Sequence, residues 1–306
     1  MQGCQPVVAD HPIAKIVPGK GMYHSLCTLE FNLDIESGTC SVTLNDDGTS
    51  NNDKVCKYCF ASYLYKKGNS YKVKEIRESE FKKIQEKYNP DRKGVVLRLG
   101  KNFDVGHKRT RSQLYQVLEY SKKYSFRPII TSKLLEYDPE ISKLVIESNG
   151  IVHLSLSGRD EDETGAASQG ATNRWRLAQA IKYKRHKTPV QCRIVADVTI
   201  PPTDFHEKAF NLMGGSSGIL LTMLHYTKKS HFESIRKDIT WDEAKTQGLF
   251  AYTSGDLRPL VQHDGWKKYR EKCGTISREY CNNCVRKIDF NKHQYKQQLQ
   301  QLGWGT

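Results

Sequence analysis

Strands and helices alternate along most of this chain, and this order restricts its fold more than any other feature. Short apolar runs typical of strands lie at residues 28–33, 94–99, 127–132, 151–157, 190–200 and 218–226. Segments with helical spacing follow them at residues 77–88, 111–124, 138–148, 173–184, 204–213 and 240–249. Six such pairs predict an α/β fold with a parallel sheet, which is either doubly wound or rolled into a closed or partial barrel.

The loops after these strands are the expected place for function. No G-x-G-x-x-G opens a helix and no G-x-x-x-x-G-K-[ST] is present, which argues against the nucleotide-binding folds that depend on those motifs. In parallel α/β folds, functional residues lie at the C-terminal ends of strands and in the loops that follow. We therefore expect the site at that edge of the sheet.

The chain is strongly basic, with a formal net charge of +14. Such an excess favours polyanionic partners through the release of counterions, although a basic solvated surface explains it equally well. No apolar run approaches the ~18 residues of a membrane helix, and the start does not read as a secretory signal. We therefore expect a cytoplasmic protein with no membrane partner.

Nine cysteines suggest metal binding. They are clustered, and in a reducing compartment an odd number argues against a closed disulfide framework. Cys40, Cys56 and Cys59 form a C-x15-C-x2-C pattern in the loop after the first predicted strand. Three thiolates would leave one iron of a four-iron cluster open to a small molecule. The same spacing also fits a zinc site with Cys27 as the fourth ligand.

The pair within "CKYCF" (56–60), placed after the first strand of a six-unit barrel, resembles the signature of the radical S-adenosylmethionine (SAM) superfamily. Tyr58 stands in the aromatic position of that signature. The gap between Cys40 and Cys56 is wider than usual, which leaves open whether Cys40 or Cys27 is the first cluster ligand. The segments "SGTC" and "CFA" also resemble small phage-associated members of the superfamily, and "ADVTIPP" (196–202) is similar to a strand end in spore photoproduct lyase-like members.

This resemblance implies a partial (βα)6 TIM barrel over residues 21–260, an N-terminal arm over 1–20 and a small cysteine-containing extension over 261–306. It also implies contacts with SAM. Tyr58 would lie beside the adenine, and Gly100 with Asp104 stands where relatives hold the methionine amino group. The other implied contacts come from Lys133, from Ser155 and Ser157 near the ribose, and from Arg174 or Arg176 at the methionine carboxylate. Each of these residues also has an ordinary structural explanation, such as a tight turn at Gly100 or a solvated helix face at Arg174.

A second group of cysteines, Cys273, Cys281 and Cys284, lies near the C-terminus in "CGTISREYCNNC". With His263 or His293 these thiols would form a zinc site. With another cysteine or an external ligand they would hold an auxiliary iron–sulfur cluster, as extensions of radical SAM enzymes often do. Both interpretations remain open at this point.

The resemblance predicts an enzyme with a [4Fe–4S] cluster and SAM as cofactors. It would cleave SAM reductively to a 5′-deoxyadenosyl radical that abstracts a hydrogen atom from the substrate, with an electron donor such as flavodoxin or ferredoxin. The basic charge makes a nucleic acid or nucleotide the leading substrate, and a peptide is the alternative. The rival class is a non-enzymatic nucleic-acid-binding protein with structural zinc sites.

Overall fold

The structure is a computed structural model, and it describes residues 12–18, 30–45, 47–51, 54–56, 71–90, 95–158, 165–226, 229–253 and 256–271. Several residues singled out in the sequence lie outside these ranges. They are Cys27, Tyr58, Cys59, Cys273, Cys281, Cys284 and His293.

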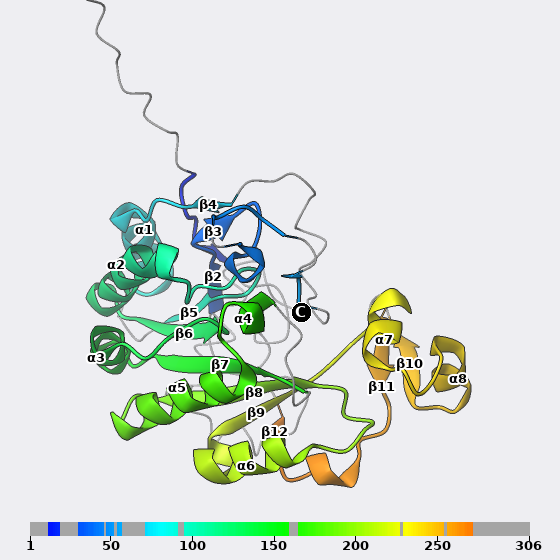
Figure 1. The fold of residues 1–306 in the computed structure, drawn as a ribbon. Helices are drawn as coiled ribbons and strands as arrows, with labels where there is room; N and C mark the ends of the chain where they lie inside the picture. The colour runs from blue at the N-terminus through cyan, green and yellow to red at the C-terminus, as the bar shows by residue number, and fades with distance from the viewer. Residues whose placement is uncertain are drawn as a thin grey trace, which may run out of the picture.

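The core of the fold is one sheet with the strand order β1-β2-β5-β6-β7-β8-β9-β12 (Figure 1). Its six main strands run parallel and follow one another in chain order: β2 (Glu30–Leu33), β5 (Val95–Leu99), β6 (Phe126–Ser132), β7 (Ile151–Ser157), β8 (Val190–Ala196) and β9 (Ile219–Met223). At the two edges lie the short strands β1 (Val17–Pro18), antiparallel to β2, and β12 (Arg270–Glu271), parallel to β9. In the described part of the chain these edge strands do not pair with each other, so the prediction of a partial barrel is confirmed.

Helices cover the outer face of this sheet (Figure 1). They are α1 (Glu78–Tyr88), α2 (Arg111–Lys123), α3 (Pro139–Glu147), α5 (Asn173–Arg185) and α6 (Asp204–Met213). The short α4 (Gly165–Ser168) precedes α5 in the chain and packs against the loop after β2. The start of α3 illustrates the local cause: the Asp138 carboxylate accepts the N–H groups of Glu140 and Ile141, and Pro139 occupies the first turn. None of the helices in the described ranges is both long and apolar enough to cross a membrane.

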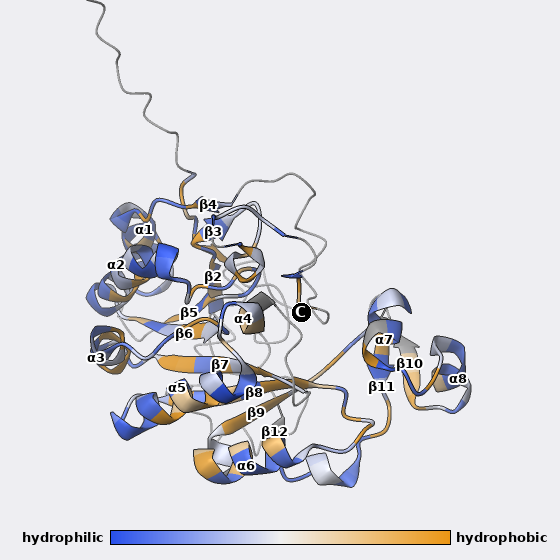
Figure 2. Cartoon of the chain, in the orientation of Figure 1, coloured by the Kyte–Doolittle hydropathy of each residue, from blue (hydrophilic) through white to orange (hydrophobic). Residues whose placement is uncertain are grey.

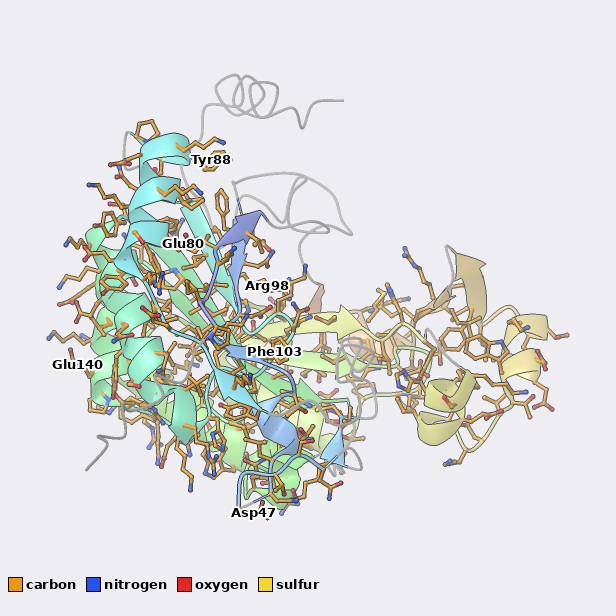
Figure 3. The ribbon with its side chains drawn as sticks, turned by 90° about the horizontal axis from the view of Figure 1, so that it is seen from above. Asp47, Glu80, Tyr88, Arg98, Phe103 and Glu140 are labelled. Carbon is orange, nitrogen blue, oxygen red and sulfur yellow. The ribbon has the colours of Figure 1, made fainter. Side chains whose placement is uncertain are left out.

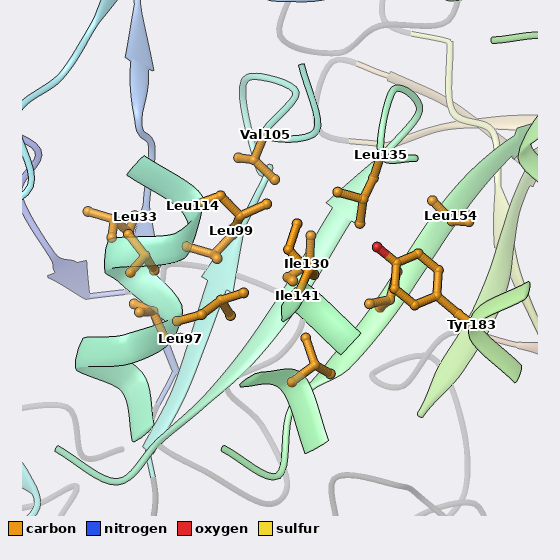
Figure 4. Close-up of a cluster of buried hydrophobic side chains, with 14 of the residues drawn as sticks. Leu33, Leu97, Leu99, Val105, Leu114, Ile130, Leu135, Ile141, Leu154 and Tyr183 are labelled. Carbon is orange, nitrogen blue, oxygen red and sulfur yellow. The ribbon is translucent and has the colours of Figure 1, made fainter. Parts of the chain in front are cut away.

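The main core lies between the sheet and these helices. Every second strand residue contributes to it, for example Leu97 and Leu99 of β5, which belong to one cluster with Leu114 of α2 and Ile141 of α3 (Figure 4). Figure 2 shows the corresponding pattern of apolar strands under helices with hydrophilic outer surfaces. The burial of these side chains is the main force that holds the layers together.

The inner face of the sheet is more polar. Arg98 lies between two core residues of β5, and His153 and Ser155 occupy the alternate positions of β7. Because successive strand residues point to opposite faces, these side chains face away from the helices. All three are buried. The fold therefore surrounds a polar interior beneath the C-terminal ends of the strands.

A small lobe follows β9 and lies beside the sheet (Figure 1). It consists of α7 (Lys229–Ile235), α8 (Trp241–Thr246) and the hairpin β10 (Phe250–Thr253) with β11 (Asp256–Pro259). It has its own apolar cluster, which includes Tyr226, Phe232, Phe250 and Leu257. The helix expected at residues 240–249 is thus shorter, and it packs in the lobe instead of covering the sixth strand.

Residues 264–271 pack against the barrel. Trp266 is fully buried in the main core, and its indole N–H donates to the carbonyl of Ile200 at 2.7 Å. Tyr269 joins the same cluster before β12 adds to the sheet. The first described part of the expected C-terminal extension is therefore continuous with the barrel core.

Candidate active site

Cys40 lies in the loop that follows β2, where it precedes the short 3-10 helix η1 (Ser41–Thr43). The side chain is buried, and its sulfur accepts the backbone N–H of Asp104 at 3.2 Å. Asp104 comes from the loop after β5, so this contact joins the ends of two neighbouring strands. The first predicted cluster ligand is thereby placed at the C-terminal edge of the sheet.

The side chains of Glu36 and Gln169 hold the Cys40 loop. The buried carboxylate of Glu36 accepts the N–H of Ser41 at 3.2 Å and the hydroxyl of Tyr71 at 3.0 Å. The side-chain amide of Gln169, which follows α4, donates to the carbonyls of Ser41 and Val42, both at 3.0 Å. The position of Cys40 therefore depends on residues from the loops after β2 and β7.

Cys56 lies in the same apolar cluster as Cys40. The buried members of this cluster are Cys40, Val42, Ala166 and Ala171, and its partly buried members are Cys56, Phe103, Leu134 and Trp175. Both cysteines are free thiols. In Figure 3, Phe103 lies near the centre of the view, whereas Glu140 lies at the edge formed by the helices. The fold thus brings two cysteines, separated in sequence by fifteen intervening residues, to one place at the mouth of the barrel.

Lys133 lies beside Cys56. Its ammonium group donates to the sulfur of Cys56 at 3.0 Å, and the side chain is buried. Lys133 directly follows β6, so the loop after that strand also contributes to the site. The resemblance to the radical SAM superfamily implies that this lysine contacts SAM, and in the structure it lies next to a predicted cluster ligand.

Asp104 connects the loops after β5 and β6. One carboxylate oxygen accepts the N–H of Gly106 at 2.9 Å and the hydroxyl of Ser132 at 2.6 Å, and the other accepts the N–H of Lys133 at 2.6 Å. The hydroxyl of Ser132 in turn accepts the N–H of Leu135 at 2.9 Å. Sequence reasoning noted Asp104 only by its place after Gly100, because hydrogen bonds between loops leave no periodic signal.

The surroundings of Cys40 disfavour the thiolate form of its side chain. Burial raises the pKa of the Cys40 thiol well above its usual range, and the nearby carboxylates of Glu36 and Asp104 raise it further. Burial also raises the pKa of Glu36 well above its usual value. Metal binding would deprotonate such a thiol, because the thiolate is the form that binds metals.

The residues present fit an iron–sulfur cluster. Two cysteine sulfurs share a largely apolar cluster, and each accepts an N–H donor, which is the environment that iron–sulfur thiolates take. Within the described ranges no three metal-binding side chains gather at one point. The third cysteine of the pattern, Cys59, lies outside those ranges.

Gly100 allows the loop after β5 to turn close to β6. Its φ is +78°, and a Cβ atom at this position would collide with the carbonyl oxygen of Thr131. Only glycine adopts this conformation without strain and leaves room for that carbonyl. The positive φ angle and the close Thr131 carbonyl therefore explain why position 100 requires glycine.

Ser155 and Ser157 lie on β7, and both backbones are fixed by helix residues. The carbonyl of Ser155 accepts from the guanidinium of Arg176, which is fully buried and also donates to the carbonyl of Ala171 at 2.9 Å. The N–H of Ser157 donates to the side chain of Asn173 at 2.9 Å. Arg174, between these two helix residues, is exposed. Of these two arginines, Arg176 is bound to the backbone of β7, whereas the side chain of Arg174 is accessible to solvent.

A cavity of about 350 Å³ opens at the C-terminal ends of β7, β8 and β9. Its lining combines apolar and charged side chains: Ser157, Gly158, Val195, Asp197, Ile200, Leu224, Ile235, Arg236, Lys237 and Asp238. Ser157 is the one predicted SAM contact among them. Arg236, Lys237 and Asp238 follow α7 and were not anticipated from the sequence.

A buried ion pair joins this cavity to the small lobe. The guanidinium of Arg236 donates to the Asp197 carboxylate at 3.0 Å, and the Tyr226 hydroxyl donates to the same oxygen at 2.9 Å. The other side of the guanidinium forms two hydrogen bonds with Asp238, at 2.8 and 2.6 Å. Hydrogen bonding with Arg236 holds the pKa of Asp238 below its usual value. The Asp197 carboxylate also accepts the N–H of Thr199, which helps to explain why β8 ends at Ala196 and not at residue 200 as expected.

Comparison with known proteins supports the fold. No family model and no curated protein matches the chain. Among solved structures, it is similar to a mutant of spore photoproduct lyase with bound AdoMet and a dinucleoside spore photoproduct, with a TM-score of 0.50 and 14% identity over 75% of this chain and 68% of that one. It is also similar to anSMEcpe with bound AdoMet and a peptide, with a TM-score of 0.42 and 15% identity over 72% and 61% of the two chains. The first match shows that the chain shares the fold of spore photoproduct lyase.

Proposed function

We propose that this chain is a radical SAM enzyme. The observation that carries the proposal is the meeting of Cys40 and Cys56 in one apolar cluster at the mouth of a partial barrel. Two further facts support it: the sequence resembles the cysteine signature of that superfamily, and the fold is shared with a lyase whose structure holds AdoMet.

Cys40, Cys56 and Cys59 would hold a [4Fe–4S] cluster. When bound, the cluster would supply the electron that cleaves SAM to methionine and a 5′-deoxyadenosyl radical, which takes a hydrogen atom from the substrate. The chain's own contribution is ligation, orientation and exclusion of water. The burial of Cys40, together with the hydrogen bonds that fix its loop, serves the last two purposes.

The proposed SAM contacts divide between the two halves of the mouth. Lys133, beside Cys56, and Gly100, in the loop after β5, are proposed to contact the methionyl end of SAM. Arg174, accessible at the start of α5, is proposed to pair with the methionine carboxylate. Ser157 lines the cavity beyond β7, whose apolar wall and size suit an adenosyl group. Tyr58 is proposed to lie beside the adenine.

The substrate is proposed to be a nucleic acid or a nucleotide. The net charge of +14 supports a polyanionic partner, and the structure of the similar lyase contains a dinucleoside spore photoproduct. The reductant would be a low-potential donor such as flavodoxin or ferredoxin. The cysteines at 273, 281 and 284 are proposed to hold a second metal site, either an auxiliary cluster or zinc.

Anaerobic purification followed by metal analysis tests the proposal. A radical SAM enzyme would be brown after reconstitution, with about four or more irons per chain. The Cys56→Ala variant should lose the iron held by Cys40, Cys56 and Cys59. The Cys192→Ala variant should keep it, because Cys192 is a buried core residue of β8. A colourless protein with stoichiometric zinc and no iron would instead identify a zinc-containing nucleic-acid-binding protein.

A further inference from the structure

We propose that Lys133 raises the reduction potential of the iron–sulfur cluster, so that the reduced state becomes accessible to a biological donor. This inference rests on the proposed function, because it concerns the cluster that Cys56 would ligate. It adds a role for Lys133 that does not depend on SAM. The argument starts from the contact between the Lys133 ammonium group and the Cys56 sulfur, at 3.0 Å.

The backbone fixes Lys133 at this position. Its N–H donates to the carboxylate of Asp104 at 2.6 Å, and the preceding residue, Ser132, donates its hydroxyl to the same carboxylate at 2.6 Å. Ser132 also accepts the N–H groups of Leu134 and Leu135, both at 2.9 Å. The loop after β6 is therefore held by several hydrogen bonds at the point where the lysine leaves it.

The surroundings make the lysine charge effective. Lys133 is only 7% exposed, and Cys56 packs in a cluster with Phe103, Leu134 and Trp175. In such a site the effective dielectric constant is lower than in water, so a charge next to a sulfur ligand acts more strongly. A surface lysine at a similar distance would be screened by solvent.

The charges around the site make this lysine important. Acidic side chains hold the neighbouring backbone: Asp104 accepts the N–H of Lys133 at 2.6 Å, and Glu36 accepts the N–H of Ser41, next to Cys40, at 3.2 Å. Negative charge near a cluster opposes its reduction. The backbone N–H of Asp104, which donates to the Cys40 sulfur at 3.2 Å, acts in the opposite direction. Lys133 places a buried ammonium group beside Cys56, where its positive charge acts against this negative charge.

Reduction adds one electron, and thus one negative charge, to the cluster without forming or breaking a covalent bond. The potential of an iron–sulfur cluster depends on net charge, hydrogen bonds to the sulfurs and exposure to solvent. A buried ammonium group stabilises the reduced state more than the oxidised state. Removal of Lys133 should therefore move the potential to more negative values.

The experiment is a redox titration of the full-length, anaerobically reconstituted protein, without SAM. Dithionite supplies the electrons and is oxidised to sulfite, and the EPR signal of the reduced cluster reports the midpoint. For Lys133→Met we expect at least a tenfold lower ratio of reduced to oxidised cluster at a given potential, which corresponds to a shift of about 59 mV for one electron. Lys133→Arg should stay close to the wild type, because it keeps the charge.

Lys143→Met is the matched control. It removes the same charge from an exposed position on α3, where Lys143 pairs with Glu140 on the surface. Its midpoint should equal that of the wild type. The EPR signal follows only protein that holds a cluster, so a lower iron content in Lys133→Met does not affect its midpoint.

The outcomes separate this inference from the proposed function. If the wild type holds no iron–sulfur cluster, the proposed function and this inference both fail. If the wild type holds a cluster and Lys133→Met titrates at the wild-type midpoint, the role of Lys133 is refuted and the proposed function stands. If Lys143→Met shifts as much as Lys133→Met, the effect reflects overall charge, and the local role is equally refuted.

Discussion

The carboxylate of Asp104 accepts the backbone N–H of Lys133 at 2.6 Å, and this contact joins the loops that follow two neighbouring strands. The backbone N–H of Asp104 also donates to the sulfur of Cys40. A single aspartate thus connects the loops after β2, β5 and β6. These are the loops that position both described cysteines and the lysine beside them.

Replacing Asp104 with asparagine should loosen these loops. In the wild type, N–H and hydroxyl groups donate to both oxygens of the Asp104 carboxylate. The asparagine amide keeps one acceptor oxygen, but its NH2 group would face donors in place of the other. We expect the free energy of unfolding to fall by about 1–3 kcal/mol, measured by urea denaturation. Asp264→Asn, at an exposed position, is the control and should change stability by no more than about 0.5 kcal/mol. Equal effects of the two substitutions would show that Asp104 does not hold the loops together.

Gly100 and Gly248 offer a matched test of steric need. Both have positive φ angles, +78° and +67°, but a Cβ at Gly100 would meet the Thr131 carbonyl whereas a Cβ at Gly248 would meet nothing within 4 Å. Gly248→Ala should cost about 1–2 kcal/mol through backbone strain alone. Gly100→Ala should cost about 1–3 kcal/mol more, because the loop must move away from β6. Thermal or urea unfolding of the two variants measures the difference, and similar losses would contradict the close approach.

Much of the barrel could be predicted from the sequence, because strands and helices leave periodic patterns. The run at 151–157 matches β7 at both ends, and the helix expected at 204–213 matches α6. The cysteine spacing also indicated a site in the loop after the first strand, where the structure places Cys40. These features depend on local sequence, so they can be read without knowledge of the fold.

The connections around the site could not be predicted in this way. Gln169 donates to the Cys40 loop from a position more than 120 residues away, and Arg236 reaches the end of β8 from a lobe that the sequence pattern did not reveal. Trp266 belongs to the barrel core although the residues around it read as the start of a separate extension. Each of these contacts depends on tertiary packing, which leaves no mark in a single sequence.

The Arg236 ion pair should contribute strongly to stability. Both Arg236 and Asp197 are buried, so Arg236→Met would leave a buried carboxylate without its cationic partner. We expect a loss of about 3–5 kcal/mol in the free energy of unfolding. Lys229→Met removes one partner of an exposed pair with Glu233 in the same lobe and should cost less than about 1 kcal/mol. If Arg236→Met lowers the free energy of unfolding only slightly in urea denaturation, this ion pair does not stabilise the attachment of the lobe to the barrel.

Asp238 should make stability depend on pH in the acid range. Hydrogen bonding with Arg236 lowers the folded-state pKa of Asp238 below its ordinary value of 3.8. A lowered pKa means that the contribution is fully present above the ordinary value and is lost as the pH falls through the folded-state value. Asp238→Asn should therefore be less stable than the wild type near neutral pH, and the two urea midpoints should converge at low pH. A difference that stays constant across this range would contradict the ionic role.

The central claim is that Cys56 ligates a cluster that cleaves SAM, and the most direct measurement is the formation of 5′-deoxyadenosine by reduced, reconstituted protein. We predict that the wild type and Cys192→Ala release 5′-deoxyadenosine and methionine on addition of dithionite and SAM. Cys56→Ala, folded as judged by circular dichroism, should release neither. Continued cleavage of SAM by Cys56→Ala, or no cleavage by an iron-loaded wild type, would contradict the account.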